Sequence, residues 1–413
     1  MDRSSIAEDY EKLLNLGIAL SSVHDLEKLL GLILKEARRL THADAGTLYL
    51  VEDHKLTFKV SQCQSLIDRL GEESMRRMYQ SFEMPISRES IAGYAALTKG
   101  ILNIPNVKDI PQEAFYRYNP TWDERAEYIS QSMMVVPMLN RADKVVGVLQ
   151  LINALRDGRV VPFLPEYEKL VSSLASQAAV AIENAELAED LKQAHLDTLF
   201  RLGVAAEYRD KETANHIKRM SRYCALIAGG LGWSADGVNG IIWSSLMHDV
   251  GKLGIPDAIL QKPGRLTAEE RRIMEYHTVI GGNILKGSEA PVLKQSRVVA
   301  LTHHEKFDGT GYPRGLKGEE IPIEGRITIL ADVFDALSSK RVYKEALLEE
   351  EVLCILGEGQ SSFFDPNILN IFFRRLDAAR EIRDRYVDQA EDFDKFRNLD
   401  YLMIEEVGES KKT

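Results

Sequence analysis

The side chains most able to do chemistry in this chain are histidines and carboxylates that recur in its second half. Five of the nine histidines fall between positions 216 and 304. Glu212 and His216 are four residues apart, a spacing that places both on one face of a helix. The complete set consists of Glu212, His216, His248, Asp249, His277, His303, His304 and Asp332. All are expected on helices that face apolar sequence, so we expect them to converge.

Convergence of these groups favours a metal centre over ordinary core histidines. Taken singly, a helical histidine is more often a satisfied core or surface residue, and Glu212–His216 could be a helix-surface pair contributing roughly a few tenths of a kcal/mol. Together, so many imidazoles and carboxylates are costly to bury without a cation. Imidazole and carboxylate without thiolate suit Fe, Mn, Zn, Co or Ni. Asp249 could bridge, which predicts at least two ions, the arrangement that serves phosphoester displacement.

The elements that must position these residues are helical. From about residue 200 onward the sequence has mainly helical periodicity, interrupted by glycine and proline. Before it, residues 166–202 contain no Gly or Pro and predict one long helix. Apolar residues recur there at near-heptad spacing, with Asn184 in the seam, at Leu170, Val180, Leu187, Leu191 and Ala194. The helix could pair two chains in parallel, or it could be a connector packed on its own domain.

The first 165 residues mix helical and strand periods. Helical spacing over 26–40 is followed by strand-like runs at 46–53, 55–60, 132–139 and 144–153, joined by short polar turns. This alternation predicts an α+β domain in which helices flank a mostly antiparallel sheet.

Residues 86–107, followed by VVPMLNRADKVVGVLQLIN, closely resemble a GAF domain, and the match covers roughly residues 15–185. The resemblance implies a regulatory, ligand-sensing or dimerising module. The family's cyclic-nucleotide members carry an Asn-Lys…Phe…Asp-Glu signature, whereas this chain has Asn153-Ala154, Phe163 and Tyr167-Glu168. The missing Lys and Asp argue against cyclic-nucleotide sensing, and the ligand stays unknown.

The runs HDVGKLGIPDAILQKPGRL, HHEKFDGTGYPRGLKGEEIPIEGRI and ADVFDALSSKRVYKEAL resemble an HD-GYP phosphodiesterase domain over about residues 200–385. That family is known for cleaving cyclic di-GMP. The resemblance implies that His216, His248, Asp249, His277, His303, His304 and Asp332 bind metal, with Asp249 bridging. Glu212 matches the extra carboxylate of members that hold three ions. A trinuclear iron or manganese centre is therefore expected first, and a dinuclear one second.

The same resemblance implies the substrate contacts. Lys252 would contact the scissile phosphate and help its leaving oxygen, and Arg341 and Lys344 would grip phosphates, although Lys340 stands where an Asp is common. Tyr312, in a loop where Gly309, Gly311 and Gly315 allow unusual backbone angles, offers a ring on which guanine could stack. The expected mechanism is attack by a metal-bridging hydroxide, giving pGpG and, with three ions, GMP.

Two further carboxylates, Asp308 and Asp335, are expected to hold the metal ligands in position. The whole chain is thus predicted to be multidomain: a GAF sensor domain (1–165), a linker helix (166–202), an all-α HD-GYP phosphodiesterase domain (203–385) and a C-terminal tail (386–413).

The composition of the chain limits the kinds of partner and the cellular location that we expect. The chain of 413 residues has 63 acidic and 52 basic residues and a net charge of −11, which argues against binding a nucleic-acid polymer. No uncharged run is long enough to span a membrane, and three scattered cysteines suit a reducing cytoplasm. We therefore expect a cytoplasmic homodimer, paired through the GAF domain and linker helix. Two alternatives stay open: hydrolysis of another cyclic dinucleotide such as 3′3′-cGAMP, and a non-catalytic cyclic di-GMP-binding signalling protein.

Overall fold

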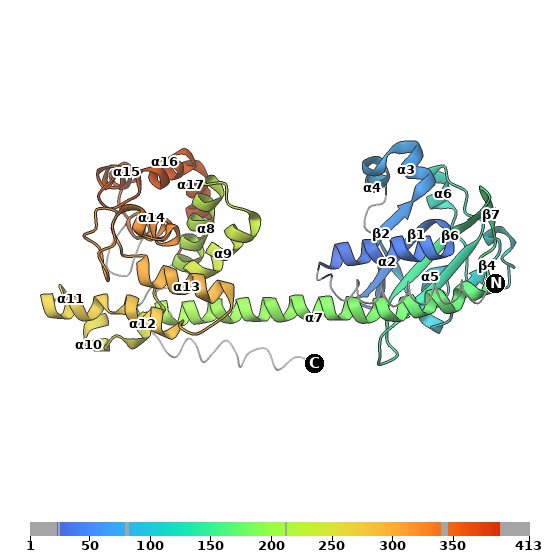
Figure 1. The fold of residues 1–413 in the computed structure, drawn as a ribbon, viewed down its shortest axis with the longest axis horizontal. Helices are drawn as coiled ribbons and strands as arrows, with labels where there is room; N and C mark the ends of the chain where they lie inside the picture. The colour runs from blue at the N-terminus through green and yellow to red at the C-terminus, as the bar shows by residue number, and fades with distance from the viewer. Residues whose placement is uncertain (1–22, 24, 79–81, 211–212, 340–345, 389–413) are drawn as a thin grey trace. The chain divides into compact units, whose positions relative to one another are not determined.

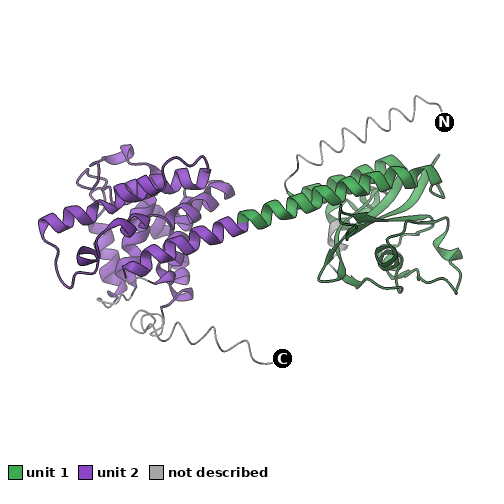
Figure 2. Ribbon diagram, turned by 90° about the horizontal axis from the view of Figure 1, so that it is seen from below, with its two compact units in different colours: residues 1–192 green, residues 193–413 purple. Residues whose placement is uncertain are grey.

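The computed structural model describes residues 23, 25–78, 82–210, 213–339 and 346–388. The chain divides into two compact units, Met1–Lys192 and Gln193–Thr413 (Figure 2). One long helix, α7 (Pro165–Arg209), contributes residues to both units (Figure 1). The finer division into four segments predicted above remains a prediction.

The first unit is built on an antiparallel sheet in the order β3-β2-β1-β6-β5-β4, with β7 paired to β6. The strands are β1 (Ala43–Glu52), β2 (Lys55–Cys63), β3 (Glu83–Pro85), β4 (Leu102–Ile104), β5 (Met133–Leu139), β6 (Val145–Arg156) and β7 (Arg159–Val161). The four predicted runs correspond to β1, β2, β5 and β6. The predicted α+β architecture is confirmed.

Helices cover both faces of this sheet. The helical elements are α2 (Leu26–Thr41), α3 (Gln64–Leu70), α4 (Glu72–Met78), α5 (Ile91–Thr98), α6 (Thr121–Ala126) and the 3-10 turn η1 (Val107–Asp109). Ile33 of α2 and Leu174 of α7 are buried in one core with Leu48 of β1. On the opposite face, Ala95 of α5 packs in a second core with Tyr49 of β1. Strand alternation sends Leu48 and Tyr49 to these different faces.

The described part of the second unit is helical. Its helices are α8 (Ala214–Gly230), α9 (Ala235–Ser245), α10 (Asp257–Leu260), α11 (Ala268–Glu275), α12 (His277–Ile284), α13 (Pro291–Thr302), α14 (Ile323–Ser338), α15 (Glu349–Glu358), α16 (Pro366–Arg374) and α17 (Leu376–Arg385), with 3-10 turns η2 (Val250–Gly254) and η3 (Gly318–Glu320). Ile227 of α8, Val299 of α13 and Leu330 of α14 share its main core. The predicted all-α domain is confirmed.

Helix α7 runs seven residues beyond the expected end at 202. Gly203 lies inside it, where a Cβ would approach the Leu246 carbonyl oxygen to 2.8 Å. The glycine therefore allows close packing of α7 on the chain after α9, which keeps the helix intact despite the intrinsic cost of glycine. Among the described helices, none combines the length and the apolar character needed to cross a membrane.

Candidate metal centre

Three of the predicted histidines lie at the boundaries of helices rather than in their interiors. His248 comes three residues after the end of α9, and His303 directly follows α13. His277 comes two residues after the end of α11 and is the first residue of α12. The Nδ1 atoms of His248, His277 and His303 lie 3.0 Å from Ser245 O, 2.7 Å from Met274 O and 3.2 Å from Ala300 O. The last carbonyls of a helix have no intrahelical partner, so each accepts the Nδ1 proton of the histidine three residues on. The expectation that the HD and HH pairs sit within helices is wrong at these positions.

This shared arrangement sets the chemistry of each ring. With Nδ1 donating to a carbonyl, Nε2 is the atom left to bind a metal ion. The Nε2 atoms of His277 and His303 face each other at 3.3 Å. Two lone pairs this close need a cation or a proton between them.

His216 lies in the first turn of α8 and is held by a carboxylate instead. Its Nδ1 is 2.8 Å from Oδ2 of Asp335, which is buried in α14. Arg219 donates to both oxygens of Asp335, at 2.6 and 3.0 Å, and through a third nitrogen to Asp388 at 2.8 Å. Although burial raises the pKa of Asp335, His216 and Arg219 lower it to about 2. Asp335 therefore stays ionised and orients the imidazole of His216.

Asp249 stands between two groups of candidate ligands. Its Oδ1 lies 3.1 Å from Nε2 of His277 and 3.4 Å from Nε2 of His303, and these three residues form one group with His304. Its Oδ2 lies 3.3 Å from Nε2 of His248. The two oxygens of one carboxylate thus face different imidazoles, the arrangement that a bridging ligand requires.

The second group contains Glu207 together with His216 and His248. Oε1 of Glu207 is 3.6 Å from Nε2 of His248, and its side chain is almost fully buried in the last turns of α7. Asp332, in α14, borders the group with Oδ1 3.8 Å from Nε2 of His216. Within each group the candidate ligand atoms all lie within 4.8 Å of one another.

The residues present fit divalent metal ions. Among the described residues, Glu207 Oε2, His248 Nε2 and Asp249 Oδ1 are buried without a hydrogen-bond partner. Burying such polar atoms costs free energy of folding unless a cation or another partner binds them. Burial, joined by the neighbouring His303, holds the pKa of His304 well below its usual value, so that ring is a neutral potential ligand.

Lys252, in η2, is the cation that the chain itself places beside this centre. Its Nζ lies 2.5 Å from Oδ2 of Asp210 and 2.7 Å from Oδ2 of Asp249. Burial lowers the pKa of Lys252, but Asp249, Glu207 and Asp210 outweigh burial and raise it well above its usual value. Lys252 is therefore a buried ammonium in contact with the candidate bridging carboxylate.

The glycine-rich loop after α13 places Tyr312 against the centre. Its ring centroid is 4.7 Å from that of His304 at an interplanar angle of 30°. Gly311 has no room for a side chain, since a Cβ there would lie 2.5 Å from the His304 carbonyl oxygen. Glu305, which is fully buried, closes the loop by accepting hydrogen bonds from the backbone nitrogens of Arg314 at 2.8 Å and Leu316 at 3.0 Å.

Asp308 differs from its expected role. It accepts hydrogen bonds from the backbone nitrogen and hydroxyl of Thr310, at 2.8 and 2.7 Å, and so shapes an exposed turn. Glu212, Arg341 and Lys344 lie outside the described residues. Sequence reasoning missed Glu207 and Asp210, five and two residues before Glu212, and it missed Glu305, which directly follows the HH pair.

Comparison with known proteins agrees with the two predicted domain types. Residues 25–182 match the GAF domain family, and residues 202–368 match the HD domain family. The chain therefore carries a GAF domain followed by an HD domain.

Relatives named as cyclic dinucleotide phosphodiesterases match about half of this chain. The "Cyclic di-GMP phosphodiesterase response regulator RpfG" of Xanthomonas campestris pv. campestris is 42% identical over 205 residues, which cover 49% of this chain and 54% of the relative. A "Cyclic di-GMP phosphodiesterase" of Thermotoga maritima is 43% identical over 203 residues (48% and 54%). The "3'3'-cGAMP-specific phosphodiesterase 2" of Vibrio cholerae is 38% identical over 215 residues (52% and 41%). The matched segments thus span about half the length of these relatives.

Proposed function

We propose that this protein is a metal-dependent phosphodiesterase that hydrolyses cyclic di-GMP under the control of its GAF domain. The observation that carries the proposal is Asp249, whose two oxygens face His277 on one side and His248 on the other. The printed names of the relatives support a cyclic dinucleotide as substrate.

The proposed metal centre has two halves that share Asp249. His277, His303 and His304 would hold one ion. His216, His248, Glu207 and Asp332 would hold a second. Glu212 would supply the extra carboxylate for a third. Iron is the first choice and manganese the second, as the HD-GYP resemblance implies, and imidazoles and carboxylates without thiolate are compatible with both.

In the proposed reaction, water attacks phosphorus in line with the departing 3′ oxygen, and the P–O3′ bond breaks. Bound divalent ions would supply a nucleophile at neutral pH by lowering the pKa of coordinated water from about 15.7 toward about 7. Lys252 would neutralise charge on the leaving oxygen, which gains a proton. Tyr312 would stack on a guanine, and Arg341 and Lys344 would bind phosphates. The first product is linear pGpG, and a second hydrolysis gives GMP.

A second substrate has specific support, since one of the relatives is named for 3′3′-cGAMP. The two cyclic dinucleotides share the phosphodiester ring and differ in one base. The candidate ligands Asp249, His277, His303 and His304 lie close together, which disfavours a binding protein without activity.

The test uses the full chain purified without chelator and reloaded with Fe(II) or Mn(II). Cyclic di-GMP and 3′3′-cGAMP are supplied separately, and products are separated by chromatography. We expect pGpG from cyclic di-GMP at a higher kcat/KM than any product from cGAMP. Faster cGAMP turnover would reassign the substrate. Failure to cleave either molecule with metal bound would overturn the proposed activity.

The GAF domain offers a cavity of about 340 Å³ for its unknown ligand. Phe82 stacks on Trp122 at 4.7 Å and on Phe58 at 5.3 Å along its wall. Asn153, at the position of the family's cyclic-nucleotide signature, instead donates to the Tyr128 hydroxyl and the Ile129 carbonyl, at 2.9 and 2.7 Å. The cavity therefore suits a small, partly apolar molecule, and we propose that its occupancy regulates hydrolysis.

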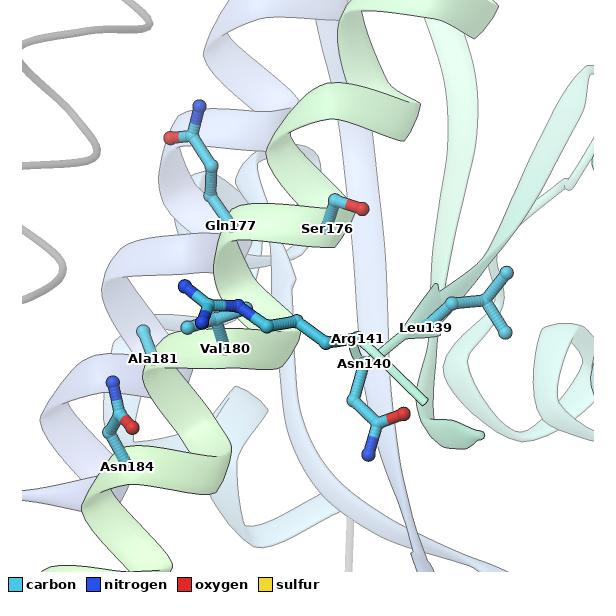
Figure 3. Close-up of a pocket in the computed structure, with 8 residues that line it drawn as sticks. All are labelled: Leu139, Asn140, Arg141, Ser176, Gln177, Val180, Ala181 and Asn184. Atoms are coloured by element: carbon cyan, nitrogen blue, oxygen red, sulfur yellow. The ribbon is translucent and has the colours of Figure 1, made fainter. Parts of the chain in front are cut away.

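We further propose a parallel homodimer that pairs through α7. Gln177, Val180, Asn184, Leu187 and Leu191 recur at alternating spacings of three and four residues, and Leu187 and Leu191 are 59% and 58% exposed. A groove beside the start of this seam is lined by Arg141 of the β5–β6 hairpin and by α7 (Figure 3). Asn184 falls at an a position, where asparagine favours parallel dimers.

All three cysteines are free thiols, in keeping with the proposed cytoplasmic location.

A further inference from the structure

The last turns of α7 reach directly into the metal centre. Glu207 lies in the last turn of α7 and Asp210 is the residue directly after this helix, and both face Lys252. The Lys252 ammonium lies 2.5 Å from Oδ2 of Asp210 and 3.6 Å from Oε2 of Glu207. Asp210 is the closer partner and, unlike Glu207, lies in neither group of candidate ligands.

Arg209, between these carboxylates, fixes the backbone that carries Lys252. Its guanidinium donates to the carbonyl oxygens of Lys252 at 2.9 Å and Ile255 at 3.1 Å, and to the carboxylate of Asp257 at 2.6 Å. Arg209 at the end of α7 therefore holds the main chain of η2, and Asp210 directly after it holds the ammonium of Lys252.

Lys252 and a metal ion compete for the same oxygen. Oδ2 of Asp249 is 2.7 Å from the Lys252 ammonium and 3.3 Å from Nε2 of His248. An ion bound beside His248 would need this oxygen and would repel the ammonium. The ammonium of Lys252 would then lose its ion pair with Asp249. Because a buried ammonium is costly when unpaired, it needs another anion as its partner.

We infer that Asp210 is a positioning residue that holds Lys252 when a metal ion takes Asp249 from it. With Asp210 present, the ammonium keeps a carboxylate partner and remains beside the centre, where the proposed reaction needs it. This inference rests on the proposed metal-dependent function. Since α7 also supplies Val171 and Leu174 to the GAF core, Asp210 directly follows the helix that would carry a signal from the GAF domain.

The test is a double-mutant cycle on metal affinity, measured by calorimetric titration of Mn(II) into the chelator-treated full chain without substrate. Asp210→Asn should weaken Mn(II) binding about tenfold, the lower end of the effect of removing a residue that supports a metal ligand. In a Lys252→Met background the same substitution should change affinity less than about twofold, because no ammonium is left to hold.

Asp197→Asn is the matched control, because Asp197 is an exposed carboxylate of α7 that pairs with Arg201 at 2.7 Å. It should leave Mn(II) affinity unchanged. Melting temperatures of the metal-free variants verify folding. A tenfold loss from Asp210→Asn that persists with Lys252→Met would contradict the inference, since Asp210 would then act through its charge alone. Absence of Mn(II) binding by the unmodified chain would instead contradict the proposed function.

Discussion

Oδ2 of Asp335 accepts a hydrogen bond from Nδ1 of His216 at 2.8 Å, across 119 residues of sequence. Both side chains are buried, and Arg219 holds the carboxylate from the other side. The bond fixes the tautomer of His216, so that Nε2 is the atom available to a metal ion. A carboxylate behind a histidine ligand also makes the imidazole a better donor.

Asp335→Asn should weaken binding at the half of the centre that contains His216. The substitution replaces the charged carboxylate that accepts the Nδ1 proton of His216 with a neutral amide. Loss of such a supporting carboxylate typically lowers metal affinity about 10–100-fold. We expect one fewer ion per chain by elemental analysis after dialysis. Asp365→Asn is the control, because Asp365 also pairs with a partly buried arginine, Arg326, at 2.7 Å. If both variants lose metal equally, the loss in Asp335→Asn does not arise from its hydrogen bond to His216.

The stability of the metal-free protein should fall between pH 6.5 and about 9. Burial lowers the pKa of His248, but Asp249 and Glu207 outweigh it and raise the pKa from 6.5 to about 9. A raised pKa means that the folded state holds this proton more tightly than the unfolded state. Its stabilisation is complete below pH 6.5 and is lost as the pH rises through about 9. Thermal unfolding with chelator should show this decline, and His248→Asn should remove it.

Metal binding should show the opposite trend with pH. An ion that binds Nε2 of His248 must displace its proton, so affinity should rise about tenfold per pH unit below the pKa of about 9 and then level off. Calorimetric titration of Mn(II) in buffers of different ionisation enthalpy would count the released protons. Affinity that does not change between pH 6 and 8 would exclude His248 as a ligand.

Gly251→Ala should destabilise the second unit. A Cβ on Gly251 would lie within bonding distance of the His277 carbonyl, so η2 would have to move away from α12. Overpacking of this kind typically costs about 1–3 kcal/mol. Gly229→Ala, in α8 with open space around it, should instead be neutral or stabilising by up to about 1 kcal/mol. Chemical denaturation of both variants measures the difference, and equal effects would contradict the close packing at Gly251.

Leu187→Glu should convert the proposed dimer into a monomer. Glutamate in the seam of a coiled coil buries like charges opposite each other. Light scattering across a concentration series would report the mass. Leu97→Glu is the control, since Leu97 is 48% exposed on α5 and outside the seam. A wild-type chain that is monomeric at high concentration would rule out the dimer.

The sequence predicted the two domain types and most residues of the candidate metal centre that the structure brings together, because periodicity and local motifs carry that information. Strand alternation marks β1 and β6, and the HD and HH pairs mark His248 and His303. Glu207 and Asp210 could not be found in this way, since the segment AEYRD looks like an ordinary helix surface. Only the packing of α7 on the chain after α9 brings these carboxylates to Lys252.

A second difference between the prediction and the structure concerns where the helices before His248 and His303 end. Local periodicity predicts that His248 and His303 continue their helices, whereas both follow the last helical residue. One signal was available: each histidine lies close behind an apolar helical run, where free carbonyls can accept Nδ1–H. The hydrogen bond from Arg219 to Asp388 joins residues 169 positions apart, and no local sequence pattern could predict it.

The most direct test of the account compares the unmodified chain with Asp249→Ala after loading with Mn(II). We expect at least two ions per unmodified chain and hydrolysis of cyclic di-GMP to pGpG. The variant should retain fewer than one ion and show no turnover above background, because both halves of the centre share Asp249. Full metal content and full activity in Asp249→Ala would contradict the central claim.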